Sequence, residues 1–181
     1  MIQNPILPGF NPDPSIIRTG EDYYLVTSSF EWFPGVPLYH SRDLDHWELV
    51  DYLLKTKEYL DLTGAKPSRG VWAPGLSYCA QEKRFYLIYS NVHNQNKWMF
   101  DVDNYMIWTD DIRGEWSKPA YLNSSGFDPS LFHDDDGRKW LINKDRDFRP
   151  VNVDHRAIVI QELDAKEMKL IGTPVVISRG A

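Results

Sequence analysis

A short phrase that occurs three times is the feature of this sequence that most constrains its fold. The copies are Asn-Pro-Asp-Pro-Ser around Pro14, Trp-Ala-Pro-Gly around Pro74 and Phe-Asp-Pro-Ser around Pro129. The prolines lie roughly 55 to 60 residues apart, a period in the range expected for one blade of a propeller. Each copy is therefore predicted to open one structural unit of similar size.

The residues that follow each copy have the pattern of antiparallel β-strands. First comes a run of aromatic and β-branched residues, which are enriched in strands. A polar turn separates each run from the phrase, and a further apolar run follows downstream. The two sets of runs are 23–26, 85–88 and 139–142, and then 36–40, 105–108 and 157–160. Each unit is predicted to be a four-stranded antiparallel sheet, which makes the chain an all-β protein.

The predicted architecture is a β-propeller, with about three blades in a single domain of residues 1–181. The blades are expected at approximately 10–55, 70–120 and 121–178. Closed propellers typically have four to eight blades, so these residues are interpreted as the N-terminal portion of a larger propeller. Three blades leave two open sheet edges, and open edges favour pairing with another chain. The alternative is a non-catalytic binding module that completes its propeller by self-association through these edges.

The propeller geometry places equivalent positions of successive blades around one axis. Asp13, Ala73 and Asp128 occupy equivalent positions in the three phrases and should converge. Two carboxylates at the mouth of a channel suit acid–base chemistry. The alternative is that each Asp-Pro pair only forms a turn or a strand entry, which is the commoner role of a single copy.

The amino-acid composition indicates which kinds of molecule the chain could bind. Aromatic residues make up 14% of the chain, with seven tryptophans and ten tyrosines. They suit packing between blades or the stacking of sugar rings. The net charge is −6 without a basic cluster, which argues against nucleic acid as a partner. The acidic run at 134–137 lacks the spaced ligands of a calcium loop and is predicted to be a hairpin turn.

The single cysteine, Cys79, excludes an internal disulfide framework and fits a reducing compartment. Its place in a predicted strand indicates a buried structural thiol. The N-terminal residues form no apolar signal region, and no run of 18 apolar residues could span a membrane. The expected location is cytoplasmic, without a membrane partner.

Four longer motifs resemble glycoside hydrolase family 43, in particular its β-xylosidases. They occur in the family's order and together span essentially the whole chain. The motifs are 4–15, which contains the first phrase, Ser-Phe-Glu-Trp-Phe-Pro-Gly-Val at 29–36, Gly-Val-Trp-Ala-Pro at 70–74 and Ser-Gly-Phe-Asp-Pro-Ser-Leu-Phe at 125–132.

The resemblance implies a five-bladed propeller that hydrolyses β-xylosides or α-arabinofuranosides of xylan-derived oligosaccharides with inversion of configuration. Asp13 then corresponds to the general base that deprotonates water. Asp128 corresponds to the carboxylate that orients the general acid and raises its pKa. Phe30, Trp72 and Ala73 match positions that wall the sugar subsite. This chemistry uses neither a metal nor an organic cofactor.

The sequence departs from the family pattern in two places. The family's general acid is a glutamate in a Thr-Glu-Gly-Pro-His-like phrase at the start of the fourth blade, and no glutamate here stands in such a phrase. The isolated chain is therefore expected to have little or no activity. In addition, Asn-Lys-Asp-Arg-Asp at 143–147 stands where related xylosidases have a Met-Tyr-Trp-Asp-like segment. The preference for xylose or arabinose is left open.

Overall fold

The computed structural model describes residues 2–95, 100–145 and 157–179, and every regular element among them is a β-strand. The strands form three four-stranded sheets. The first sheet contains β1 (Ser15–Thr19), β2 (Asp22–Val26), β3 (Gly35–Ser41) and β4 (Glu48–Leu54). The second contains β5 (Gly70–Cys79), β6 (Arg84–Gln95), β7 (Phe100–Thr109) and β8 (Ala120–Asn123). The third contains β9 (Phe127–His133), β10 (Lys139–Asp145), β11 (Ala157–Asp164) and β12 (Lys169–Arg179).

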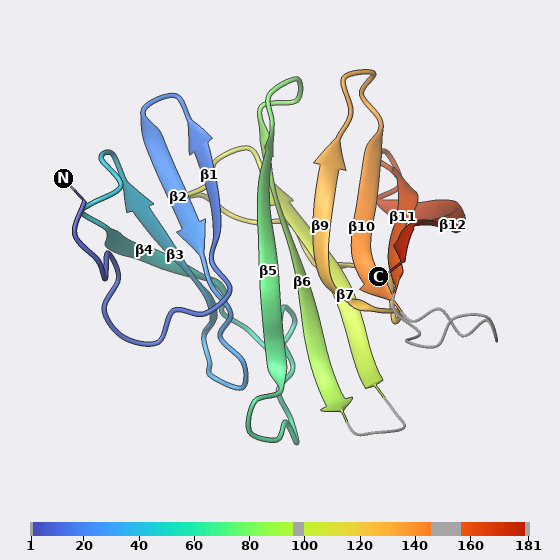
Figure 1. The fold of residues 1–181 in the computed structure, drawn as a ribbon, viewed down its shortest axis with the longest axis horizontal. Helices are drawn as coiled ribbons and strands as arrows, with labels where there is room; N and C mark the ends of the chain where they lie inside the picture. Colours follow the sequence, from blue (N-terminus) through green and yellow to red (C-terminus); the bar gives the residue numbers. More distant parts are fainter. Residues whose placement is uncertain (1, 96–99, 146–156, 180–181) are drawn as a thin grey trace.

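Within each sheet, every strand pairs antiparallel with the next strand in the chain. The first strands of the three sheets, β1, β5 and β9, lie side by side near the middle of the molecule (Figure 1). The outer strands β4 and β12 lie toward opposite ends of the view. This is the arrangement of consecutive propeller blades, and the predicted fold class, an all-β propeller with three four-stranded antiparallel blades present, is confirmed.

The second sheet extends further along the chain than expected. A third blade was predicted to begin at residue 121, but Tyr121 belongs to β8 and pairs with Tyr105 of β7. The two rings contact each other edge to face, with centroids 5.9 Å apart. Cross-strand aromatic contacts of this kind stabilise strand pairing. The third sheet therefore begins with β9, at Phe127.

Among the described residues, two apolar cores lie between neighbouring sheets. The middle sheet is covered on both faces, so β6 is buried without alternation from Phe85 to Val92. By contrast, β1 alternates between partly buried and exposed residues. The core between the first and second sheets includes Val26, Leu38, Leu53, Val71, Leu87 and Ile107. The core between the second and third includes Cys79, Ile88, Met106, Leu131, Leu141 and Leu163.

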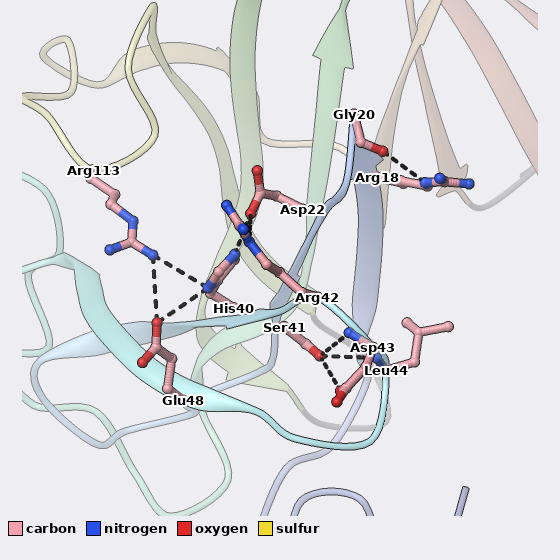
Figure 2. Close-up of polar contacts among 10 residues, drawn as sticks. All are labelled: Arg18, Gly20, Asp22, His40, Ser41, Arg42, Asp43, Leu44, Glu48 and Arg113. Atoms are coloured by element: carbon pink, nitrogen blue, oxygen red, sulfur yellow. Dashed lines mark hydrogen bonds and ion pairs between the residues drawn. The ribbon is translucent and has the colours of Figure 1, made fainter. Parts of the chain in front are cut away.

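A charged cluster joins the first sheet to the second (Figure 2). His40 of β3 lies with Nε2 2.7 Å from Oδ1 of Asp22 and with Nδ1 3.1 Å from Oε1 of Glu48. Arg113, from the segment between β7 and β8, reaches both His40, at 3.3 Å, and Glu48, at 3.5 Å. Polar contacts at the surface thus connect the first two sheets in addition to apolar packing.

A second ion pair joins the second sheet to the third. Lys139, at the start of β10, has a side chain that is only 2% exposed, and its Nζ donates a hydrogen bond of 2.7 Å to Oε1 of Glu82. The hydroxyl of Tyr86 donates to the other oxygen of Glu82. Glu82 lies in the turn between β5 and β6, so a charge from each sheet is neutralised at the boundary.

Two smaller sequence predictions are also confirmed. Cys79 is a buried free thiol within β5. The acidic run at 134–137 forms a hairpin turn, in which the amide of Gly137 donates to the carbonyl of Asp134 at 3.0 Å. Among the described residues, the structure contains no helix of the length and apolar character needed to cross a membrane.

Candidate active site

The three equivalent positions of the repeated phrase share one unusual backbone conformation. Asp13, Ala73 and Asp128 have φ angles of +52°, +33° and +52°. A residue with a Cβ rarely adopts such a left-handed conformation, because Cβ then crowds the following carbonyl. Aspartate tolerates it better than alanine does, since its side chain can hydrogen-bond locally. The repeat in the sequence therefore encodes a repeated backbone turn at the start of each sheet.

Two of these turns coincide with irregularities in strand pairing. The register of β5 with β6 shifts between Trp72 and Gly75, around Ala73. The register of β10 with β9 shifts between Ile142 and Lys144, opposite Asp128. Bulges of this kind bend a strand and redirect a side chain, and they are frequent next to active sites.

Asp13 is held by a hydrogen bond from a buried serine. The hydroxyl of Ser28, a residue that is 2% exposed, donates to Oδ2 of Asp13 at 2.6 Å. The same hydroxyl oxygen accepts a hydrogen bond of 2.7 Å from the backbone amide of Ala73. The amide of Ser28 donates to the carbonyl of Pro12 at 3.0 Å. Ser28 therefore connects the phrase of the first sheet with that of the second.

Asp128 interacts electrostatically with Asp13. Partial desolvation by the surrounding protein raises the pKa of Asp128 above its usual value, and the negative charge of Asp13 raises it further. The positive charge of Lys144 acts in the opposite direction. The carboxylates from the first and third sheets are thus close enough to influence each other, as the propeller geometry predicted.

Aromatic side chains form a continuous row beside these acids. Phe30 contacts Trp72 with ring centroids 6.4 Å apart, and Trp72 contacts Phe127 at 6.1 Å, both edge to face. The backbones of Phe30 and Val71 form two mutual hydrogen bonds of 3.0 Å, which fix Phe30 beside the second sheet. Of the residues predicted to wall a sugar site, Phe30 and Trp72 therefore contact each other, and Ala73 is linked to Asp13 through Ser28.

The row extends beyond the residues that the sequence predicted. Phe10 lies 5.8 Å from both Phe30 and Trp32, measured between ring centroids, and Phe100 lies 4.9 Å from Phe127. Phe10 and Phe127 stand in the same phrases as Asp13 and Asp128, and this shared position was the signal that could have identified them. A hollow of about 290 Å³ is lined by Phe10, Phe30, Glu31, Trp32 and Ser68.

The loop that precedes Asp128 is fixed by buried asparagines. Asn104 of β7 donates to the carbonyls of Ser125 and Gly126, each at 3.3 Å. Asn143 of β10 donates to the carbonyl of Ser125 at 2.9 Å. Gly126 has a φ of +70°, and a Cβ added there would lie 2.0 Å from the carbonyl oxygen of Lys144. Only glycine fits at this position, so the entry into β9 is tightly specified.

Lys144 brings a positive charge to the site. Its Nζ lies 4.9 Å from the centroid of the Phe127 ring, which is within the range of a cation–π interaction. Lys144 belongs to the charged segment that departs from the family pattern, whereas Arg146 and Asp147 lie outside the described residues. Within the described ranges, no group of three or more His, Cys, Asp or Glu side chains is placed to hold a metal ion.

The fold and the site together define a propeller with two interacting carboxylates beside the row of aromatic side chains, which is called the aromatic wall below. Comparison with known proteins places the chain in a family. The model of the glycosyl hydrolases family 43 matches residues 2–181. The chain belongs to this family.

Named relatives are similar over nearly the whole chain. The chain is 54% identical over 171 residues to the xylosidase/arabinosidase 43B of Humicola insolens, covering 94% of this chain and 31% of that protein. It is 52% identical to the β-xylosidase of Bacillus subtilis, covering 99% and 33%. The crystal structure of a xylan β-1,4-xylosidase from Bacillus halodurans superposes with a TM-score of 0.93 at 53% identity, covering 100% of this chain and 34% of that one. The chain thus spans about a third of the length of these relatives.

Proposed function

We propose that this chain forms the part of an inverting glycosidase that supplies its general base, and that the whole enzyme cleaves β-xylosides or α-arabinofuranosides. The observation that carries this proposal is the pairing of Asp13 with Asp128 beside one aromatic wall. Relatives named as xylosidases and arabinosidases support the choice of substrate class.

Asp13 is proposed to remove a proton from the attacking water. One of its oxygens accepts the hydrogen bond from Ser28, and the other is available to the water. Asp128 is proposed to orient the general acid and to raise the pKa of that acid through its negative charge. Phe30, Trp72 and Ala73 are proposed to enclose the sugar, since aromatic faces complement the apolar faces of sugar rings.

The general acid is proposed to come from residues beyond the 181 of this sequence, in the remaining blades of a five-bladed propeller. In an inverting enzyme the acid and the base stand about 6.5 to 9.5 Å apart, so that a water molecule fits between the base and the sugar. Protonation of the leaving group contributes roughly 10²- to 10⁴-fold to the rate. The 181 residues alone are therefore expected to turn over substrate slowly or not at all.

A chimera tests this proposal. The matching third of the Bacillus subtilis β-xylosidase is replaced by this chain, and hydrolysis of nitrophenyl β-xyloside and nitrophenyl α-arabinofuranoside is measured. The chimera is expected to be active, and Asp13→Asn to reduce its kcat at least about 10²-fold. Asp134→Asn, in the hairpin turn, is the matched control and is expected to keep full activity. Equal activity of Asp13→Asn and the unchanged chimera would reject the proposed base.

A second candidate function is a non-catalytic sugar-binding module completed by self-association. It is favoured by apolar side chains exposed on the third sheet, namely Phe132, Ile171 and Val175. Sedimentation velocity of the 181-residue chain distinguishes the two candidates. A discrete dimer would favour the module, whereas a monomer or a broad aggregate favours a segment of a larger propeller.

A further inference from the structure

We propose that Ser28 is a positioning residue for the catalytic base, and that it fixes the rotamer of Asp13 relative to the aromatic wall. This inference rests on the proposed function for its catalytic meaning. Its structural content is independent of that function, because it concerns which contacts hold the Asp13 side chain. Nothing in the sequence pattern distinguishes Ser28, which stands in an ordinary Thr-Ser-Ser run.

The contacts of the Ser28 hydroxyl determine the direction in which it donates its proton. A serine hydroxyl has one proton and two lone pairs. The amide of Ala73 donates to the oxygen at 2.7 Å, so this side of the hydroxyl is an acceptor. The proton is then directed to Oδ2 of Asp13, at 2.6 Å.

The contacts also fix the side chain in space. Ser28 lies just after β2, is almost fully buried, and donates its own amide to the carbonyl of Pro12. It therefore holds the backbone before Asp13 and the carboxylate of Asp13 at once. Because one carboxylate oxygen is tied to Ser28, the other is presented in a defined direction.

Ser28 further couples the base to the wall. The segment that begins at Ser28 continues to Phe30, whose backbone pairs with Val71 of β5. The Ala73 amide that donates to Ser28 lies next to Trp72 in the same strand. The buried hydroxyl of Ser28 thus sets the position of Asp13 relative to the strand that carries Trp72 and Ala73. A misplacement of about 1 Å at a reacting group can cost on the order of 10²-fold in rate.

The charged groups that face Asp13 determine how the experiment is read. Asp128 interacts with Asp13, and Lys144 interacts with Asp128. Neither is altered in the variants of Ser28, so a change in kcat would report the lost hydrogen bond to Asp13 rather than a lost charge.

The first measurement needs no catalysis. Three-bond NMR couplings report the χ1 angle of Asp13 in the 181-residue chain. The unchanged chain is expected to show one Asp13 rotamer, and Ser28→Ala to show averaged couplings at Asp13. Ser29→Ala is the matched control, because Ser29 also accepts a hydrogen bond from a backbone amide, that of Val36 at 3.2 Å. The Ser29 variant keeps the hydroxyl of Ser28 and is expected to leave the Asp13 couplings unchanged.

Ser28→Cys covers the case in which the alanine variant does not fold. A thiol is close to a hydroxyl in size but is a weak donor, so the same averaging at Asp13 is expected. A single fixed Asp13 rotamer in both Ser28 variants would overturn the inference, whether or not the proposed function is correct.

The second measurement uses the chimera. Ser28→Ala is expected to lower kcat about 10- to 100-fold with little change in KM. Ser29→Ala is expected to stay within about 2-fold of the unchanged chimera, since it leaves the base in place. An inactive chimera would remove the proposed function but leave the rotamer result standing. An active chimera with unchanged kcat in Ser28→Ala would overturn the positioning role.

Discussion

Asp128 of the third sheet has a raised pKa because it is partly desolvated and because it faces the negative charge of Asp13 at the start of the first sheet. Two like charges at one site oppose each other, and folding brings them together. Such an arrangement is expected at functional sites, where stability is exchanged for reactivity.

Replacement of Asp128 by asparagine is therefore expected to stabilise the chain at neutral pH. A carboxyl whose pKa is raised in the folded state destabilises that state when it ionises. The loss of unfolding free energy begins as the pH rises through the pKa of the unfolded chain and is complete above the pKa of the folded chain. The neutral amide of the Asp128→Asn variant would carry no such cost. Because the site is open to solvent, we expect a rise of roughly 1–2 °C in Tm at pH 7 and none at pH 3. Asp134→Asn controls for the change in net charge, and a lower Tm for Asp128→Asn at pH 7 would contradict the repulsion.

His133 predicts acid sensitivity of the boundary between the second and third sheets. Burial, followed by the positive charge of Lys139, lowers the pKa of His133 to about 4. The unfolded chain binds the proton near pH 6.5, so the unfolded state carries more protons between about pH 6.5 and 4. Stability should fall as the pH drops through this window, by at most about 1.36 kcal/mol per pH unit from this residue.

His133→Gln should flatten that dependence, because glutamine does not titrate and can still reach Ser77, which His133 contacts at 3.0 Å. Urea unfolding at several pH values measures the effect. His46→Gln provides a control of opposite sign, since hydrogen bonding to Asp43 raises the pKa of His46. Removal of His46 should therefore lower the stability of the folded chain at acidic pH relative to its stability at neutral pH. If the unfolding free energy of His133→Gln depended on pH as steeply as that of the unchanged chain, the histidine would be accessible to protons in the folded state.

The ion pair between Lys139 and Glu82 predicts an asymmetric response to mutation. Glu82→Ala leaves the ammonium of Lys139 buried without its carboxylate and should cost about 3 kcal/mol of unfolding free energy. Lys139→Met in the same background should restore most of that loss, since an unpaired charge is replaced by an apolar side chain of similar length. Denaturant unfolding of the single and double variants measures the coupling. Equal stability of Glu82→Ala and the double variant would mean that the pair is solvated.

Gly126 predicts a steric requirement at the entry into β9. Gly126→Ala places a Cβ 2.0 Å from the carbonyl oxygen of Lys144 at a φ of +70°, so both strain and a clash are introduced. Gly20→Ala is the matched control, because Gly20 has a φ of +61° and nothing within 4 Å of the added Cβ. The control should lose about 1 kcal/mol and Gly126→Ala at least about 3 kcal/mol. Similar losses in thermal unfolding would mean that the loop relaxes without cost.

The fold class could be predicted from the sequence because the phrase around Pro14, Pro74 and Pro129 repeats together with the strands that follow it. It also indicated the pairing of Asp13 with Asp128, since equivalent blade positions surround one axis.

Ser28, Lys144 and Lys139 could not be found in this way. Ser28 acts through a hydrogen bond to another sheet, and the position of Lys144 beside Phe127 depends on a register shift between β9 and β10. Lys139 has the sequence context of an ordinary strand residue, because only the packed third sheet buries its ammonium group.

The configuration of the first sugar released by the chimera reports whether Asp13 activates a water molecule. If Asp13 activates a water molecule on the face opposite the leaving group, hydrolysis of a β-xyloside releases α-xylose first, and proton NMR detects this anomer before mutarotation. We expect α-xylose from the active chimera and its loss in Asp13→Asn. Release of β-xylose first would mean that a carboxylate attacks the sugar itself, which would contradict the role assigned to Asp13.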